Sequence, residues 1–321
     1  MRKIAALLLA MLTLFGAALA EEPEVLRASG EEGAFPALNE QGFLDEGEYV
    51  YQNPEEGVWR YASQTLRIEI YRYQIAEPKD KRAIWYEAEV WSTEDNAWRL
   101  FSNTEGKHMT SQTWPYIIAR KNQTVLALNT DFAQMRYNNK KTTGIVIRDG
   151  KVFSKKTLKQ GVKQFPNLDV LALYPDGNME VYYSNEKTAE EYLEMGVQST
   201  LAFGPWLIRD GQLNEEGLAK YGNSTRAPRT AIGMVEKGHY FAMMLEGRHT
   251  GSKGGTIAFL AEKMMDRGCS LAFNLDGGET ATILFMGEQI CKVGGSSTGN
   301  ARRTPEIFGI GQSSLVPEWE K

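Results

Sequence analysis

The amino-acid sequence predicts an α+β fold in one domain: a strand-rich mixed sheet, or several such sheets, flanked by a few helices. Short segments that alternate apolar and polar side chains recur between turn-forming residues, which is the pattern of half-buried strands. Helical patterns are fewer and do not alternate with the strands, so regular βαβ winding is disfavoured. A composition of 42% hydrophobic and 24% charged residues in 321 excludes disordered, collagen-like and coiled-coil chains.

The chain begins with the features of a secretory signal peptide. Arg2 and Lys3 precede an apolar run, and the sequence Ala-Leu-Ala at residues 18–20 supplies small residues before Glu21. An uncleaved membrane anchor is the alternative, since an apolar run of about 17 residues approaches the length of a membrane span. The small-residue site favours cleavage. We therefore expect residues 1–20 to be a signal peptide and the mature protein to be secreted or extracytoplasmic, without stable membrane insertion.

The rest of the chain divides into a linker and one domain. Residues 21–48 are rich in Glu, Gly, Pro and Ala and predict a mobile linker. Residues 49–314 form the predicted domain, because no further linker divides them. Within it, strands are predicted at residues 66–73, 84–91, 116–119, 125–129, 144–148, 168–173, 179–183, 270–275, 280–286, 288–292 and 306–311. Asp149-Gly150 and Asp176-Gly177 predict tight hairpins, since these dipeptides accept the positive φ of such turns.

Two helices have clear start signals. Thr188 and Glu191 have the spacing of a capping box, which opens a short helix. A longer helix is predicted over residues 256–267, where Gly268 ends it. Four apolar residues share one face of this helix, which should therefore pack on the core: Ile257, Leu260, Ala261 and Met264.

The charge and the content of cysteine and histidine limit the partners and cofactors. A net charge of −5 argues against nucleic acid as a partner, since nucleic acid attracts basic surfaces. Two cysteines, Cys269 and Cys291, cannot build a disulfide scaffold or a structural zinc site, and whether they pair stays open. The three histidines exclude a histidine-rich metal site. We predict no cofactor and no metal.

The most unusual segment is Asn-Leu-Asp-Gly-Gly-Glu-Thr-Ala at residues 274–281. A predicted strand ends here in Asp276, followed by Gly277 and Gly278. Side chains at the end of a buried strand are held rigidly, and adjacent glycines let a ligand approach the backbone. The alternative is an Asp-Gly hairpin in which Asn274 is structural.

A second cluster lies just before the longer predicted helix. Glu246-Gly247-Arg248 is followed by a glycine-rich segment that ends at Thr256. Amides at a helix N-terminus bind anions, and Arg248 adds a bidentate donor for phosphate. The spacing of a nucleotide P-loop is absent. The alternative is a flexible surface loop capped by Thr256.

Three weaker features also pair basic or polar side chains with strand ends. Arg229 lies just before a predicted strand, Asn129 and Asp131 lie at the end of another, and Arg302-Arg303 precede the last one. Each alone is typical of a solvated strand flank. Together they indicate an anionic ligand held among carboxylates.

Four of these elements, in this order and spacing, resemble the phosphodiester glycosidase family over residues 129–311: Asn129-Thr130-Asp131-Phe132, Arg229-Thr230-Ala231-Ile232-Gly233, Glu246-Gly247-Arg248 and Asn274-Leu275-Asp276-Gly277-Gly278. Two positions depart from the family's pattern. The family commonly has Asp-Gly-Arg where this chain has Glu246, and a third Gly followed by Ser where it has Glu279-Thr280. Glu279 brings an additional carboxylate close to the predicted site.

The resemblance implies cleavage of a sugar-1-phosphodiester, such as a GlcNAc-1-phosphate diester or a related compound, into free sugar and a phosphomonoester. Catalytic roles are predicted for Asp276, Glu246 and Asn129, since carboxylates orient water or stabilise an oxocarbenium-like centre. Arginines and the amides of residues 254–256 are predicted to bind the phosphate. The predicted substrate-binding residues are Arg229, Arg248, Asn274, Gly277, Gly278, Thr256, Glu279 and Arg303.

Two other functions use the same residues. The first is a non-catalytic module of the cell envelope that binds phosphate-containing glycans. The second is a metal-dependent phosphodiesterase in which Asp131, Glu246 and Asp276 supply hard oxygen ligands.

Overall fold

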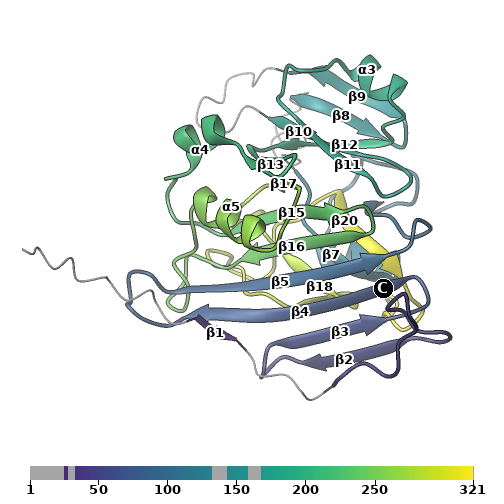
Figure 1. Cartoon of the computed structure of the whole chain (residues 1–321), viewed down its shortest axis with the longest axis vertical. Helices are drawn as coiled ribbons and strands as arrows, with labels where there is room; N and C mark the ends of the chain where they lie inside the picture. Colours follow the sequence, from purple (N-terminus) through teal and green to yellow (C-terminus); the bar gives the residue numbers. More distant parts are fainter. Residues whose placement is uncertain (1–24, 28–32, 132–142, 158–167, 321) are drawn as a thin grey trace, which may run out of the picture.

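The computed structural model describes residues 25–27, 33–131, 143–157 and 168–320 (Figure 1). The predicted signal peptide and Phe132 lie outside the described residues. The observed fold is strand-rich with few helices, which confirms the predicted α+β class.

The largest sheet forms one broad layer of the molecule (Figure 1). Its strands lie in the order β14-β13-β17-β15-β16-β5-β4-β3-β2, and β1 pairs with β4. All these pairs are antiparallel, so the start of one strand lies beside the end of its neighbour, and residues distant in sequence meet there. The bounds are β1 (Val25–Arg27), β2 (Tyr49–Asn53), β3 (Val58–Ala62), β4 (Leu66–Ile75), β5 (Ala83–Ser92), β13 (Trp206–Arg209), β14 (Gln212–Leu213), β15 (Arg229–Glu236), β16 (His239–Leu245) and β17 (Leu271–Asn274).

Three smaller sheets complete the strands of the described residues. A five-stranded sheet has the order β19-β18-β7-β20-β6, a three-stranded one β11-β10-β12, and β8 pairs with β9. Their bounds are β6 (Arg99–Ser102), β7 (Thr124–Leu128), β8 (Gly144–Arg148), β9 (Lys151–Lys156), β10 (Asp169–Leu173), β11 (Met179–Tyr182), β12 (Ser199–Phe203), β18 (Ile283–Phe285), β19 (Glu288–Gln289) and β20 (Glu306–Gln312). Asp149 and Gly150 both have positive φ between β8 and β9, as the Asp-Gly signal predicts.

The two larger sheets enclose the main core. Ile70 and Phe273 of the large sheet belong to the same buried cluster as Leu126 and Phe308 of the five-stranded sheet. The opposite face of the large sheet is covered by α5 (Ile257–Asp266), whose Leu260 packs in a second cluster. The two sheets pack face to face and bury the side chains between them. The strand ends at the edge of this sandwich are therefore held in fixed positions.

The helices confirm two predictions and correct a third. The capping box at Thr188 opens α3 (Ala189–Glu194), and Thr256 caps α5 with its four predicted core residues buried. The predicted strand at residues 116–119 is wrong: it is part of α1 (Pro115–Lys121). Pro115 starts a helix well because it needs no donor there, whereas Ile117 and Ile118 carry β propensity. Another helix, α4 (Glu215–Tyr221), was not predicted.

The segment before residue 49 is also more ordered than a mobile linker. β1 pairs with β4 along residues 73–75, and Phe43 and Leu44 are each 7% exposed. β4 extends beyond β3, which pairs with it only along residues 67–71, so its end offers backbone groups for β1.

Cys269 and Cys291 are both buried free thiols. Among the helices of the described residues, none combines the length and apolarity needed to cross a bilayer.

Candidate functional site

The segments that carry the predicted residues meet at one end of both sheets. In the large sheet Arg229 lies opposite Leu245, and Ala231 opposite Asn274, so β15 begins where β16 and β17 end. In the five-stranded sheet Leu128 lies opposite Ile283. Hydrogen bonds join the two sheets at this end, as the contacts of Asn129 show.

Asn129 ties the end of β7 to the loop that follows β17. Its Nδ2 donates to the carbonyls of Asp276 at 2.8 Å and Thr130 at 3.0 Å, and its Oδ1 accepts the Thr282 N–H at 3.1 Å. The side chain is 1% exposed. Because this buried amide is used on backbone groups, we assign Asn129 a positioning role for the Asp276 loop rather than contact with substrate.

Asn274 is likewise held by the protein. Its Nδ2 donates to the Gly204 carbonyl at 2.8 Å, and its Oδ1 is buried without a hydrogen-bond partner in the part of the chain that the structure describes. The side chain thus secures the end of β17 and leaves one acceptor unused.

Two glycines let the loops approach at backbone distance. A Cβ on Gly294 would lie 1.8 Å from the carbonyl oxygen of Gly247, so only glycine fits there. Gly278 has a φ of +68° and donates its N–H to the Pro228 carbonyl at 3.0 Å. A Cβ on Gly278 would lie 3.3 Å from Nη1 of Arg248, which places that guanidinium directly against the loop.

The two arginines near this loop have different surroundings. Arg229 donates from Nε to the Gly255 carbonyl at 3.2 Å and from Nη2 to Ser224 Oγ and the Thr225 carbonyl at 2.9 Å each. Burial and the charge of Arg248 lower the pKa of Arg229 to about 10. Arg248 is exposed and has no hydrogen bond or ion pair to any described residue. Its five donors are available to a ligand.

Asp276 has an ionisation suited to proton transfer. Burial raises the pKa of its carboxyl to about 7, against the opposing hydrogen bonds of Thr280 and of the Gly277 N–H, the latter at 2.9 Å. The charge of Arg302 also favours the carboxylate, and that of Asp131 disfavours it. A group with a pKa near 7 is present in both protonation states at neutral pH.

Glu246, in contrast, is fully occupied. Its Oε1 accepts from the Tyr86 hydroxyl at 3.0 Å and from the Lys292 N–H at 2.7 Å, and its Oε2 contacts His249 Nε2 at 2.9 Å. The side chain is only 3% exposed. We therefore interpret Glu246 as an anchor that joins three segments beside the site.

The remaining predicted residues fall into two groups. Glu279 lies at the site and pairs with Arg302 at 3.1 Å, whereas Arg303 is exposed and stacks on Trp114, 4.9 Å from the ring centroid. Arg302, not Arg303, is thus the arginine that contacts a predicted site residue. The amides of Gly254 and Gly255, predicted as phosphate donors, are bonded to Ser252 Oγ and to the Ala227 carbonyl. The Thr256 hydroxyl accepts the Phe259 N–H at 3.2 Å as the cap of α5.

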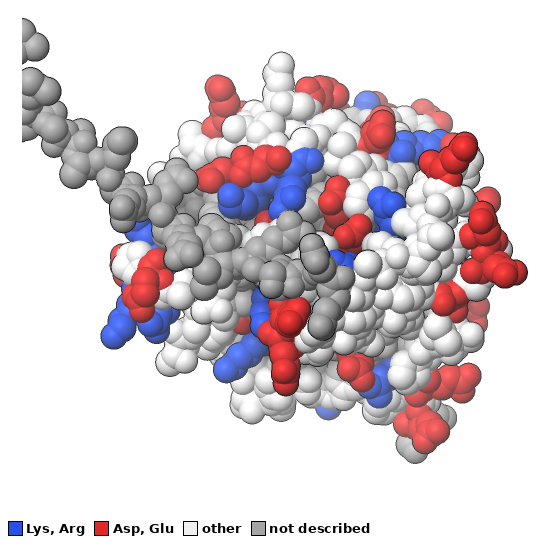
Figure 2. Space-filling view, turned by 60° about the horizontal axis from the view of Figure 1, so that its bottom comes forward, with Lys and Arg blue, Asp and Glu red and all other residues white. Residues whose placement is uncertain are grey.

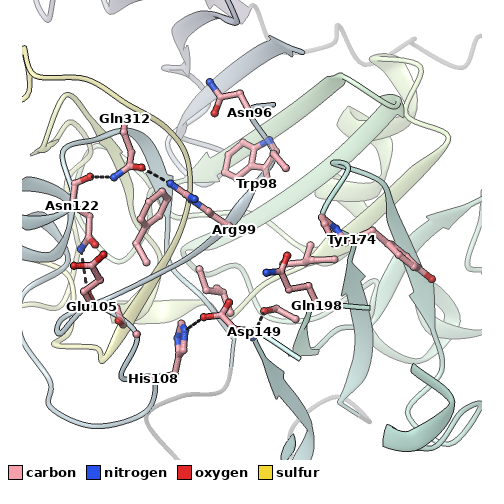
Figure 3. A pocket seen from close by; sticks show the side chains of 18 of the residues that line it. Asn96, Trp98, Arg99, Glu105, His108, Asn122, Asp149, Tyr174, Gln198 and Gln312 are labelled. Atoms are coloured by element: carbon pink, nitrogen blue, oxygen red, sulfur yellow. Dashed lines mark hydrogen bonds and ion pairs between the residues drawn. The ribbon is translucent and has the colours of Figure 1, made fainter. Parts of the chain in front are cut away.

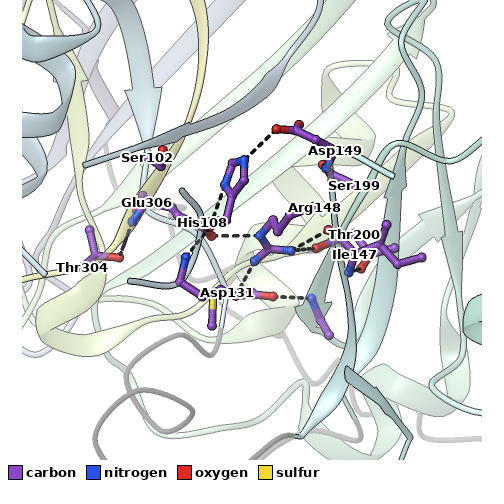
Figure 4. Close-up of polar contacts among 12 residues, drawn as sticks. Ser102, His108, Asp131, Ile147, Arg148, Asp149, Ser199, Thr200, Thr304 and Glu306 are labelled. Atoms are coloured by element: carbon purple, nitrogen blue, oxygen red, sulfur yellow. Dashed lines mark hydrogen bonds and ion pairs between the residues drawn. The ribbon is translucent and has the colours of Figure 1, made fainter. Parts of the chain in front are cut away.

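Sequence reasoning missed a buried charge network next to Asn129 (Figure 4). Arg148 Nε lies 2.9 Å from Glu306 Oε2, and its Nη2 lies 3.8 Å from Asp131 Oδ1. His108 contacts Glu306 through Nδ1 and Asp149 through Nε2, both at 2.8 Å. Although burial opposes ionisation, Arg148 and His108 lower the pKa of Glu306 to about 2. Charged residues inside apolar strand segments, as Arg148 is in Gly-Ile-Val-Ile-Arg, were the signal for this network.

A cleft lies on the other side of this network (Figure 3). It has a volume of about 700 Å³ and is lined by residues before and within β6, by His108 and Asp149, and by the ends of β10 and β12. None of the residues predicted for the site lines it. Asp149 lies between the cleft and the charge network.

Two further observations concern charge. On the face shown in Figure 2, acidic and basic side chains are interspersed. Within the described ranges, no group of three or more His, Cys, Asp or Glu residues has the geometry to hold a metal ion. Asp131, Glu246 and Asp276 do not form such a group.

Residues 122–311 match the sequence pattern of the phosphodiester glycosidase family. This chain is a phosphodiester glycosidase family member. The match covers more than half of the chain and includes every element with which the sequence resembles the family.

The individual proteins to which this chain is similar share low sequence identity with it. The SPbeta prophage-derived uncharacterized protein YomE of Bacillus subtilis (strain 168) is 26% identical over 174 residues, which are 54% of this chain and 26% of that protein. The chain thus spans about a quarter of that relative's length. The catalytic domain of zebrafish N-acetylglucosamine-1-phosphodiester α-N-acetylglucosaminidase, auto-inhibited by its pro-peptide, has a TM-score of 0.59 and 17% identity, covering 78% of this chain and 85% of that one. A hypothetical protein from Synechocystis has a TM-score of 0.48 and 15% identity, over 75% and 62%. The zebrafish domain shares the fold.

Proposed function

We propose that this protein is a secreted hydrolase that cleaves a glycosyl phosphodiester, a GlcNAc-1-phosphate diester or a related compound, into free sugar and a phosphomonoester. One observation carries the proposal. The Arg248 guanidinium, which pairs with no described residue, lies against Gly278, in the same loop as a carboxyl whose pKa lies near 7. An anion-binding group and a proton-transfer group are therefore both positioned at the loop of residues 276–278, in a member of the phosphodiester glycosidase family.

The site residues then have distinct roles. Arg248 binds the phosphate through charge-assisted hydrogen bonds, and the fixed charge of Arg229 supports it. Water attacks the anomeric carbon while the bond from that carbon to the phosphate oxygen breaks, and the electron pair leaves with the phosphomonoester. The ionised Asp276 takes the proton of the attacking water and later releases it to solvent. Because the leaving phosphate is already stable as an anion, Arg248 assists its departure by charge alone.

Other residues shape the surroundings of the reacting groups. Asn129 and Glu246 hold the loops in place through the contacts described above. The backbone of Gly277 and Gly278 admits the ligand between Asp276 and Arg248. Asn274 secures the end of β17, Thr256 caps α5, and Glu279 is the one of these three that lies on the Asp276 loop.

The test is incubation of the protein, without residues 1–20, with a synthetic benzyl GlcNAc-1-phosphodiester, followed by mass spectrometry of both products. We expect GlcNAc and benzyl phosphate in equal amounts, and we expect Asp276→Asn to abolish their release. Asp176→Asn is the matched charge control, since Asp176 pairs with Lys237 at the opposite end of the β15–β16 hairpin. Unchanged diester after prolonged incubation with stoichiometric protein that still binds it would instead identify a non-catalytic binding module.

The secreted location is supported by the sequence of residues 1–20 alone. Its test is expression of the full chain with sequencing of the N-terminus of the exported protein. We expect the exported chain to begin at Glu21. A chain that stays in the membrane fraction with Met1 intact would contradict cleavage.

A further inference from the structure

Glu279 places a negative charge beside the guanidinium of Arg248, the proposed phosphate-binding group. A site built only to attract phosphate would not contain such a carboxylate. Both side chains lie beside Gly295. A Cβ on Gly295 would lie 3.6 Å from Glu279 Oε1 and 3.8 Å from Arg248 Cδ, so the two side chains approach the same point. Gly295 has a φ of +88° and leaves that point open.

The carboxylate of Glu279 is held in this position. Its Oε2 accepts from Arg302 Nη2 at 3.1 Å, and the Arg302 N–H donates to the Glu279 carbonyl at 2.9 Å. Glu279 also belongs to the short 3₁₀ turn Gly278–Thr280, whose first residue is the glycine that lies against Arg248. These contacts keep the carboxylate on the side of the loop that faces Gly295.

The summed charge of the site is consequently small. Arg248 and Arg229 are positive, Glu279 and Arg302 offset each other, Glu246 adds a carboxylate in contact with His249, and Asp276 is partly ionised at neutral pH. A phosphodiester carries one negative charge, whereas a phosphomonoester carries up to two above its second pKa of about 6. A carboxylate near the phosphate repels a dianion about twice as strongly as a monoanion at the same distance, because the repulsion is proportional to the ligand's charge.

We propose that Glu279 is a specificity-determining residue that makes the site select phosphodiester monoanions over phosphomonoester dianions. This proposal rests on the proposed function, and it assigns Glu279 two effects there. It disfavours phosphomonoesters as competing ligands, and it promotes the release of the phosphomonoester product.

The experiment compares two small anions on the protein without residues 1–20, at about pH 8, where methyl phosphate is a dianion and dimethyl phosphate a monoanion. Dissociation constants are measured by ³¹P NMR titration, which needs no turnover. In the wild-type protein dimethyl phosphate should bind at least as tightly as methyl phosphate. Glu279→Gln keeps a group that accepts from Arg302, so the loop is retained, and the preference should shift toward methyl phosphate by about three- to tenfold.

Two variants serve as controls. Glu279→Asp keeps the charge and should retain most of the wild-type preference. Glu262→Gln removes an exposed carboxylate on α5 that lies near Lys263, and it should leave the preference unchanged. A ratio of the two dissociation constants that is equal in wild type and Glu279→Gln overturns the proposal. Absence of binding of either anion to wild type overturns it together with the phosphate site.

The outcome is separable from that of the hydrolysis assay. A shifted ratio without any hydrolysis would keep the charge selection and refute the enzymatic function. Hydrolysis with an unshifted ratio would keep the function and refute the role of Glu279. With active protein, Glu279→Gln should also become more sensitive to inhibition by benzyl phosphate, by the same factor as in the titration.

Discussion

Replacing Asp276 by Asn removes a carboxyl that the folded protein ionises only with difficulty. Burial raises the pKa of this group to about 7, from 3.8 in an unfolded chain. One pKa unit corresponds to about 1.4 kcal/mol, so the fully ionised carboxylate costs the folded state up to about 4 kcal/mol. The side chain is only partly buried, and water offsets part of this cost. We therefore expect Asp276→Asn to raise the free energy of unfolding by about 2 kcal/mol above pH 7.

The sign of the pH dependence follows from the raised pKa. The folded carboxyl binds its proton more tightly than the unfolded one, so the wild type loses stability as pH rises from about 4 to about 7. The Asn variant lacks this loss, and its amide oxygen can still accept the Gly277 N–H. Below about pH 4 the two proteins should therefore be nearly equal in stability.

The assay is urea unfolding followed by circular dichroism at a series of pH values, combined with the hydrolysis assay. The expected variant is more stable near pH 8 and inactive, which is typical of a residue kept for function. A stability difference that is the same at acid and alkaline pH would refute the reasoning from burial, as would an Asn variant less stable than wild type at alkaline pH.

Three other changes test separate parts of the structure. Arg248→Gln should weaken binding of dimethyl phosphate by about tenfold in an NMR titration, with an unchanged melting temperature since no described residue pairs with it; a large loss of stability would contradict this. His108→Gln should lower the free energy of unfolding, measured in urea, more at about pH 6 than at about pH 9. Although burial opposes it, contact with two carboxylates raises the pKa of the imidazole, so the stabilisation by the imidazolium is lost as pH rises through that value. An equal loss of stability at both pH values would argue against an imidazolium. Gly294→Ala should lower the free energy of unfolding by about 2 kcal/mol or more, because its Cβ would meet the Gly247 carbonyl. Gly299→Ala, where a Cβ meets nothing within 4 Å, should lower it less. Scanning calorimetry of both variants measures the two changes.

Local patterns predicted the elements whose signals lie within a few residues. The alternation of β4 and β5, the capping box of α3 and the apolar face of α5 depend on neighbours in sequence, and all were found where expected. The prediction of a strand at the residues of α1 was wrong for the same reason, since it gave more weight to their β-branched side chains than to the helix-start signal of Pro115. Local propensity cannot show that Ile118 packs under the five-stranded sheet, which decides the outcome.

The candidate site was predicted in outline, but the roles within it were not. Motif residues from four segments meet at one end of the two sheets, which the resemblance to a family implied. That Glu246 is saturated by Tyr86, Lys292 and His249 depends on segments distant in sequence. For the same reason neither the pairing of Glu279 with Arg302 nor the stacking of Arg303 on Trp114 could be read from the sequence.

The buried charge network also bears on how the chain is made. His108 and Arg148 precede their shared partner Glu306 by more than 150 residues, and Glu306 lies in the last strand of the described residues. During synthesis the guanidinium of Arg148 cannot pair with Glu306 until β20 has left the ribosome. A chain that stops short of Glu306 would bury that charge with only the more distant carboxylate of Asp131, 3.8 Å away, at a cost of several kcal/mol. The network therefore ties the Asn129 end of β7 to completion of the whole chain, so that fragments lacking the last strand should not assemble the site.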